Sequence, residues 1–178
     1  MNFNLELSAE SVKLRQLTPS DITDQYISWL NNTEINQFLE VRKSIPSLVE
    51  QKEYVDSCSN STDTLMLGIF SSEDNLIGSA TLRILPMNRI SVGLMIGEKS
   101  HHGRGIGKQV IMLVSNWAKE RRYSALEAGY DTRNLPSARL FKSCGFIVIR
   151  ELPSISIDFE SYIIQTTMLN LRTEGDRE

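Results

Sequence analysis

Hydrophobic and polar residues alternate along this chain with two different periods. Residues 12–17 (VKLRQL) alternate as a half-buried strand does. Three segments rich in apolar and β-forming residues, 64–70, 75–85 and 89–97, are separated by the turn-forming sequences SSEDN and PMN. They predict an antiparallel meander, and the strand-like segments 124–130, 145–152 and 161–171 complete the set.

The segments between these strands carry the 3.6-residue period of helices. Thr18 stands as a cap, and a helix starting there places Tyr26 and Trp29 on one apolar face. The sequence SLVE at residues 47–50 is a capping box that opens a second helix, which reaches about residue 57.

Two later helices begin at recognisable signals. One begins near Gly105, directly after a glycine-rich turn. The other begins after Asn134, which precedes Leu-Pro, and ends before Gly145, which suits a left-handed C-terminal residue. The order of elements predicts an α/β fold, a mixed central sheet of about seven strands flanked by helices.

Composition restricts the function classes. A chain of 178 residues with 40% hydrophobic side chains is long enough for one buried core and short for two, so we expect one domain over residues 1–172 and a polar tail at 173–178. A net charge of −3 argues against a nucleic-acid binder. The absence of a signal-peptide pattern and of a membrane-span-length apolar stretch predicts a cytoplasmic protein without membrane partners.

The two cysteines, Cys58 and Cys144, lie far apart in the sequence and belong to no Cys/His cluster. Zinc sites need such clusters, so the sequence predicts no metal ion. A disulfide framework is not expected either.

The stretch from residue 93 to 117, GLMIGEKSHHGRGIGKQVIMLVSNW, passes from a strand through a glycine-rich turn into a long helix. Gly103, Gly105 and Gly107 let the backbone turn tightly and expose N–H groups, and the helix adds the positive end of its dipole. Arg104 and Lys108 add positive charge. A ligand that carries phosphate is therefore expected at this turn.

Two common phosphate loops do not fit the spacing. A Walker-type loop requires Ser or Thr where Gln109 stands, and the dinucleotide fingerprint requires glycine where Lys108 stands. The sequence HGRGIG at 102–107 instead resembles the acetyl-CoA loop of the GNAT superfamily of N-acetyltransferases, although His102 replaces the Arg or Gln of the family pattern.

A second stretch strengthens the resemblance. Residues 127–146, EAGYDTRNLPSARLFKSCGF, are similar to the second GNAT motif, which has an Asn, a small residue three positions later, an aromatic residue and a terminal Gly-Phe. The two motifs stand at the family's separation. The resemblance covers nearly the whole chain and implies the GNAT fold with acetyl-CoA as cosubstrate.

The resemblance also implies where acetyl-CoA binds. The loop offers backbone N–H groups to the pyrophosphate, the preceding strand faces a gap that takes the pantetheine arm, Asn134 hydrogen-bonds that arm, and Phe141 flanks the thioester. Asn134 could equally serve only as a helix cap. The cosubstrate residues implied are Leu94, Met95, Ile96, His102, Gly103, Arg104, Gly105, Ile106, Gly107, Lys108, Asn134 and Phe141.

The proton-transfer groups are less clear from sequence. Many family members carry a Tyr where this chain has Phe141, and Phe141 cannot protonate the departing thiolate. Tyr130 is the nearest hydroxyl by sequence, or it serves as a packing residue. Ser91 stands where relatives carry a carboxylate base, which leaves Glu40 as a candidate base or acceptor residue beside Arg42, with Glu98 as a turn residue.

Three functions remain open. The sequences WLNNTEINQFLEVR at 29–42 and AGYDTRNLPSARLFKSCGF at 128–146 resemble enzymes that acetylate amino sugars carried on nucleotides. This resemblance makes a small-molecule primary amine the leading acceptor. A protein N-terminus, as for ribosomal-protein acetyltransferases, is the second. A catalytically silent acetyl-CoA-binding module is the third, because the family Tyr and the strand carboxylate are missing. The sequence is also compatible with a homodimer.

Overall fold

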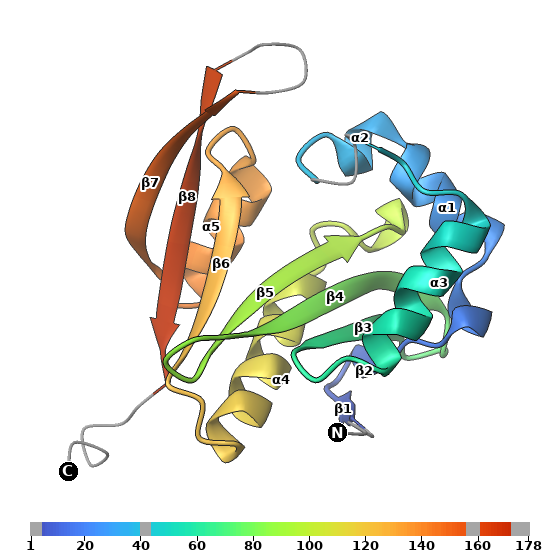
Figure 1. Ribbon diagram of the computed structural model, residues 1–178, viewed down its shortest axis with the longest axis horizontal. Helices are drawn as coiled ribbons and strands as arrows, with labels where there is room; N and C mark the ends of the chain where they lie inside the picture. The colour runs from blue at the N-terminus through green and yellow to red at the C-terminus, as the bar shows by residue number, and fades with distance from the viewer. Residues whose placement is uncertain (1–4, 40–43, 156–160, 172–178) are drawn as a thin grey trace.

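The computed structural model describes residues 5–39, 44–155 and 161–171, and their strands form one mixed sheet of eight (Figure 1). The spatial order is β1-β2-β3-β4-β5-β6-β8-β7, antiparallel except for the β5–β6 pair. The strands are β1 (Glu6–Ser8), β2 (Val12–Gln16), β3 (Thr64–Ser71), β4 (Leu76–Leu85), β5 (Arg89–Ile96), β6 (Ala125–Asp131), β7 (Ile147–Ile155) and β8 (Ser161–Asn170).

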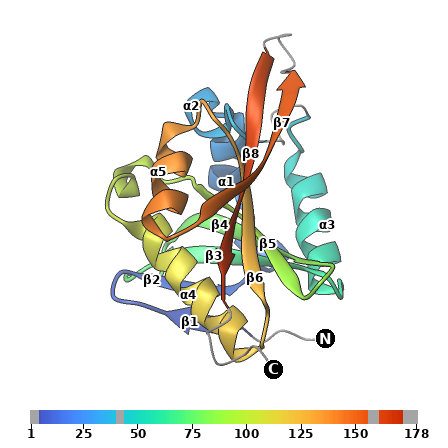
Figure 2. The same ribbon diagram turned by 90° about the vertical axis from the view of Figure 1, so that its left-hand side faces the viewer.

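Helices cover both faces of this sheet (Figure 2). The helices are α1 (Asp24–Asn31), α2 (Thr33–Asn36), α3 (Leu48–Ser59), α4 (Ile106–Glu120) and α5 (Leu135–Ser143), with 3-10 turns η1 (Pro19–Asp21) and η3 (Lys99–His101). None of the helices in the described ranges has the length and hydropathy needed to cross a bilayer.

The alternation of strand residues produces two separate hydrophobic cores. One core packs α4 and α5 against the sheet through residues such as Leu67, Val92 and Leu126. The other packs α1 and α3 on the opposite face through residues such as Tyr26 and Met66. The sheet is therefore covered on both faces, and strand residues of opposite parity serve different helices.

β5 and β6 pair only at their first residues. The register joins Arg89–Ser91 to Ala125–Glu127 and then stops, and the two strands diverge beyond this point (Figure 1). An ion pair between Arg89 and Glu127 closes this end. Beyond Ser91, β5 stays paired with β4 alone, so a wedge-shaped gap opens within the sheet.

The predicted α/β architecture is confirmed, with two differences. A short edge strand, β1, was not foreseen and raises the count to eight, because three residues are too short to show a period. The helix predicted from Thr18 is wrong at its start: the chain makes one 3-10 turn there, and α1 begins only after Thr23. The capping box at Ser47 and the left-handed Gly145 are as predicted.

Candidate cosubstrate and acceptor sites

The glycine-rich turn forms a backbone anion site at the start of α4. Gly103 and Gly105 have φ angles of 73° and 77°, a left-handed conformation that disfavours residues with a Cβ. Gly105 caps the helix, and its carbonyl accepts the first intrahelical bond from Gln109. The N–H groups of the first turn therefore have no partner within the helix and can bind an anion.

His102 fastens this turn to the sheet through its side chain. Its Nε2 lies 2.8 Å from the carbonyl oxygen of Ile96 at the end of β5. Because a carbonyl only accepts, Nε2 carries the proton and donates. The imidazole of His102, which replaces the Arg or Gln of the family pattern, therefore ties the loop to the strand.

We expect His102→Ala to weaken acetyl-CoA binding by a few-fold, up to about tenfold, because an exposed hydrogen bond that orders the loop is worth roughly 1 kcal/mol. The fold should persist. Calorimetric titration with acetyl-CoA measures the change. His101→Ala is the matched control, since among the described residues the His101 ring hydrogen-bonds the neighbouring Ser100 and not the strand. Equal losses of acetyl-CoA affinity in both variants would show that the hydrogen bond between His102 and Ile96 does not order the loop.

The residues of β5 beyond Ser91 form one edge of the gap. Leu94, Met95 and Ile96, expected to face the pantetheine arm, are paired with Ala80, Ser79 and Gly78 on β4 and with nothing on the β6 side. Their backbone N–H and C=O groups that face the gap can therefore hydrogen-bond an extended ligand that contains amides, as the groups of an edge strand do.

α5 supplies the wall on one face of the gap. The Asn134 side chain accepts a hydrogen bond from the Ser137 backbone N–H, which shows that it caps α5. Asn134 also lines the cavity, so its amide nitrogen can still donate to a ligand. Phe141 is buried between Tyr130 and Phe146 and lines the cavity as an apolar wall. The cosubstrate role of both residues stays a prediction.

The residues around Gly107 differ in how far their side chains are exposed to solvent. Ile106 is buried in the α4 core, so only its backbone can reach a ligand, whereas the side chains of Arg104 and Lys108 are exposed beside the turn. A Cβ on Gly107 would approach Leu140 to 3.0 Å, so this glycine also lets α5 pack against α4.

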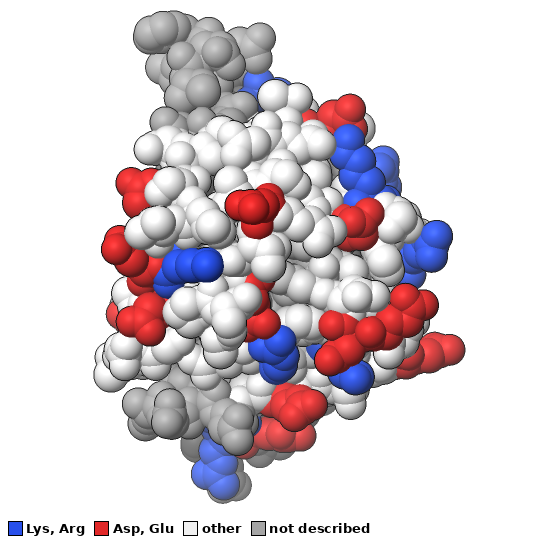
Figure 3. Space-filling model, turned by 90° about the vertical axis from the view of Figure 1, so that its right-hand side faces the viewer, with Lys and Arg blue, Asp and Glu red and all other residues white. Residues whose placement is uncertain are grey.

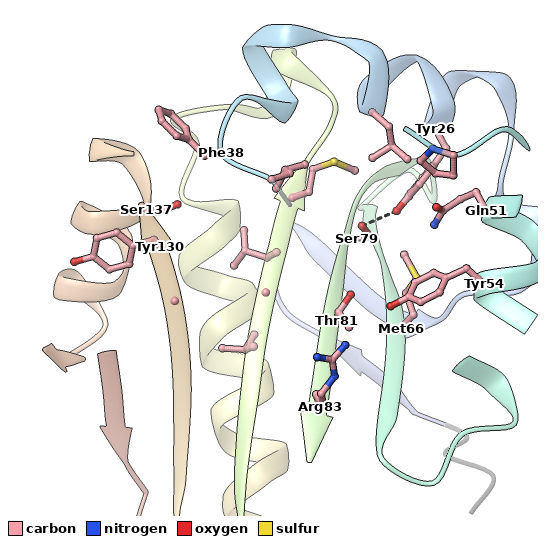
Figure 4. Close-up of a pocket in the computed structure, with 18 of the residues that line it drawn as sticks. Tyr26, Phe38, Gln51, Tyr54, Met66, Ser79, Thr81, Arg83, Tyr130 and Ser137 are labelled. Carbon is pink, nitrogen blue, oxygen red and sulfur yellow. Dashed lines mark hydrogen bonds between the residues drawn. The ribbon is translucent and has the colours of Figure 1, made fainter. Parts of the chain in front are cut away.

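A cavity of about 620 Å³ reaches through the gap to the opposite face of the sheet (Figure 4). On the α5 side it is lined by Asn134, Ser137 and Phe141. On the other side it is lined by residues of α1, α3, β3 and β4. A donor bound in the gap and a small acceptor bound on the α3 side would therefore meet within one continuous space.

The floor of the acceptor side is built from β4 and β5. Register pairs Ser79 with Met95 and Thr81 with Gly93, so these residues share the face covered by α1 and α3. The Tyr26 hydroxyl lies 3.0 Å from Ser79 Oγ, and burial raises the pKa of Tyr26 to about 12. Tyr26 is therefore protonated at neutral pH and fixes the end of the cavity.

α3 forms the facing wall with polar side chains. Tyr54 points toward Thr81 and Arg83 of β4, and Gln51 lies nearer to Tyr26 and Ser79 (Figure 4). Burial raises the pKa of the Tyr54 hydroxyl, which keeps it protonated. Glu50 also lines the cavity, but its carboxylate accepts from the Ser47 backbone N–H in the capping box.

Tyr130 lies beside the gap with its hydroxyl pointing away from it (Figure 4). The hydroxyl donates to Gln165 Oε1 at 2.6 Å, and Gln165 in turn donates to Glu151. The ring stacks on Phe141 at a centroid distance of 5.8 Å. These contacts match a packing residue, and a role as the acid would need the side chain to turn.

We expect Tyr130→Phe to leave the turnover number within a few-fold of wild type at saturating acetyl-CoA. The ring and its stacking remain, and only the bond to Gln165 is lost, at a cost of about 1 kcal/mol of stability. A fall in turnover of roughly 10²–10⁴ would instead identify Tyr130 as the acid. Gln165→Leu is the control, because it removes the same bond and keeps the hydroxyl.

The remaining candidates for the base and for acceptor binding lie in different parts of the chain. Glu40 and Arg42, expected as base and acceptor residues, lie outside the described residues. Ser91 is at the closed end of the gap, opposite Arg83 on β4. Glu98 caps η3 by accepting from Ser100, which agrees with a turn residue. In the part of the chain that the structure describes, no three His, Cys, Asp or Glu side chains gather as metal ligands.

The acceptor-side residues Tyr26, Gln51, Tyr54, Ser79, Thr81 and Arg83 were not singled out from the sequence. A signal existed for Arg83, which interrupts the apolar strand ATLRIL. The burial of the polar Gln51 is visible only in the structure. Their convergence depends on β4 facing α3, which the sequence did not specify.

The outer surface on the α1 and α3 side mixes both signs of charge. Figure 3 shows acidic and basic side chains interspersed over this face, with no continuous basic stripe among the residues drawn in colour. A polyanion-binding surface would show such a stripe. This face therefore lacks the pattern of a polyanion-binding surface among the residues drawn in colour.

A family model described as acetyltransferase (GNAT) domain matches residues 11–147. The chain belongs to this family. The matched range contains the glycine turn, the gap and all described residues of the cavity. The predicted resemblance is thereby confirmed.

Solved GNAT structures show the same fold. A GNAT-family acetyltransferase from Bacillus anthracis aligns with a TM-score of 0.80 at 12% identity, covering 94% of this chain and 99% of that one. A spermidine N-acetyltransferase from Vibrio cholerae, solved with CoA and spermine, aligns with a TM-score of 0.80 at 17% identity, covering 90% and 95%.

Among curated proteins, streptothricin acetyltransferase of Escherichia coli is 24% identical over 96 residues, 54% of this chain and 55% of that protein. An uncharacterized protein of Methanocaldococcus jannaschii is 27% identical over 146 residues, 81% of this chain and 30% of that protein. The chain thus spans about half the length, or less, of the first curated relatives it matches.

Proposed function

We propose that this protein transfers the acetyl group of acetyl-CoA to the primary amine of a small molecule, with a nucleotide-linked amino sugar as the leading acceptor. The observation that carries the proposal is the cavity of about 620 Å³ that continues from the β5–β6 gap to the α3 side. It offers one space in which a thioester and an amine can meet.

The site residues supply several parts of the chemistry. The turn at Gly103–Gly107 holds the pyrophosphate, and the unpaired edge of β5 orients the pantetheine arm. Backbone N–H groups at this edge can also polarise the thioester carbonyl. The amine then forms a C–N bond as the C–S bond breaks, and CoA leaves as the thiolate. The amine proton goes to a base, for which Glu40 stays the candidate. Tyr130 is not needed as the acid in this scheme, because its hydroxyl donates to Gln165 and points away from the gap.

Acetylation of a protein N-terminus is the second candidate. It is favoured by the fold shared with an acetyl transferase from Salmonella typhimurium that modifies the N-terminal serine of ribosomal protein L7/L12, at a TM-score of 0.79. The volume of about 620 Å³ supports a small molecule, because it is within the range of small-molecule sites. Cytoplasmic location and a homodimer also stay predictions.

The test measures amine-dependent release of the CoA thiol from acetyl-CoA with a panel of amino sugars, amino acids and peptides. The proposal expects turnover with one class of small amine and acetylated product by mass spectrometry. Turnover only with peptides would favour the second candidate. Tight acetyl-CoA binding without turnover on any amine would instead support a silent binding module.

A further inference from the structure

The acceptor side of the cavity contains a cationic side chain that no acidic side chain pairs with in the described parts of the chain. Arg83 lines the cavity from β4, and none of the five ion pairs of described residues includes it. Figure 4 shows its guanidinium directed along β4 toward Thr81 and the hydroxyl of Tyr54. The group therefore points into the space where the acceptor binds.

Two acidic side chains on this side, Glu50 and Asp63, form their hydrogen bonds with other residues and no ion pair with Arg83 in the described parts of the chain. Glu50, on the facing helix, is held by the capping box with Ser47. Asp63 lies close enough to feel the charge of Arg83, yet its carboxylate accepts from the hydroxyls of Ser61 and Thr64. The charge of Arg83 is thus left for a ligand.

Tyr54 adds a second donor to the same place. Its hydroxyl interacts with Arg83, and desolvation keeps it protonated because burial raises its pKa. The Arg83 guanidinium has only donors, and the Tyr54 hydroxyl, which also interacts with Cys58, can add its O–H when a ligand binds. Such an arrangement matches a carboxylate or a phosphate, which accept several hydrogen bonds.

The pairing of β4 with β5 places Arg83 at a distance from the gap that one small molecule can bridge. Arg83 and Thr81 stand opposite Ser91 and Gly93 on β5, the strand that borders the gap. The gap lies beyond β5, two strand spacings or about 10 Å from β4. A Cβ on Gly93 would meet no atom within 4 Å, so the floor between Arg83 and the gap carries no side chain there. One small molecule can span this distance.

We infer that Arg83 determines acceptor specificity: its guanidinium and the Tyr54 hydroxyl bind a carboxylate or phosphate of the acceptor, while the amine of that molecule reaches the thioester over Gly93. The inference rests on the proposed transfer to a small amine and narrows its acceptor to anionic molecules. A nucleotide-linked amino sugar and an amino acid both satisfy it, through phosphate and carboxylate respectively.

The experiment titrates the CoA-saturated protein calorimetrically with two matched pairs of amines. L-methionine and L-methioninamide differ by a carboxylate, and glucosamine 6-phosphate and glucosamine differ by a phosphate. We expect wild type to bind one anionic member about 10- to 100-fold more tightly than its neutral partner, and Arg83→Gln to lose this preference. The pair that shows the preference identifies the anion.

Two controls separate recognition from folding. Arg150→Gln removes an exposed arginine on β7, outside the cavity, and should retain the preference. Tyr54→Phe should lose part of it. Arg83→Gln should keep the wild-type affinity for acetyl-CoA and the wild-type circular dichroism spectrum.

Several outcomes overturn the inference. Equal binding of both members of each pair by wild type, binding of none of the four probes, or an anion preference that survives in Arg83→Gln would each do so. The proposed function fails on a different result, the absence of amine-dependent thiol release. Because the titration needs no turnover, the two failures are distinguishable.

Discussion

Gly105→Asp should reduce the affinity for acetyl-CoA by at least about 100-fold while the protein stays folded. The new carboxylate stands at the cap of α4, where it accepts the N–H groups that the pyrophosphate needs and repels its charge. Losing several charge-assisted hydrogen bonds supports an effect of this size. Asp is also among the residues that tolerate the left-handed conformation of Gly105, at φ 77°.

Gly105→Asn is the matched variant, because it has the same shape without the charge. We expect an intermediate loss, so that the difference between Asp and Asn measures electrostatic repulsion and the difference between Asn and Gly measures occupation of the N–H groups. Circular dichroism and thermal unfolding confirm the fold. Unchanged affinity in a folded Gly105→Asp protein would remove the pyrophosphate from this turn.

Gly97→Ala should lower the free energy of unfolding by roughly 2–4 kcal/mol. Gly97 follows β5, and a Cβ there would lie 2.1 Å from the ring of Trp29, which is 5% exposed. The ring cannot occupy that space, so α1 must shift away from the sheet. Because α1 also carries Tyr26, the shift should raise the acceptor KM as well.

Trp29→Leu provides the partner for a double-mutant cycle. Alone it should destabilise by leaving a void in the α1–α3 core, and together with Gly97→Ala it should recover part of the loss, because the smaller side chain accommodates the new methyl group. Urea unfolding of the four proteins measures the coupling. Strictly additive losses would show that the two residues do not share this contact.

Local signals in the sequence were sufficient for most of the fold. The capping box at Ser47, the cap at Asn134 and the left-handed Gly145 each concern a few neighbouring residues, and all three stand as predicted. Thr18 shows the limit of such signals. Its capping box exists, but it closes one 3-10 turn, and the first α-helix starts six residues after Thr18, at Asp24.

The cosubstrate side of the site could be anticipated because its parts are contiguous in sequence. A strand, a glycine turn and a helix follow one another between residues 93 and 117, so their spatial relation is set by the chain itself. The side chain of His102 was not foreseen, because its bond to Ile96 depends on how the turn folds back on β5.

The acceptor side could not be anticipated in the same way. Arg83 and Tyr54 lie on different elements, and they meet only because α3 crosses the face of the sheet to which alternate residues of β4 point. Tyr130 shows that nearness in sequence does not determine where a side chain points. It lies next to the gap, yet the parity of β6 and the bond to Gln165 direct its hydroxyl away.

The structure of the protein with bound CoA would test the central claim most directly. The account predicts the pyrophosphate against the N–H groups of Gly103–Gly107, the pantetheine arm along the unpaired edge of β5, and the sulfur opening into the cavity between Phe141 and Gly93. CoA bound away from the glycine turn, or a β5–β6 gap filled by the protein's own side chains in that complex, would contradict it.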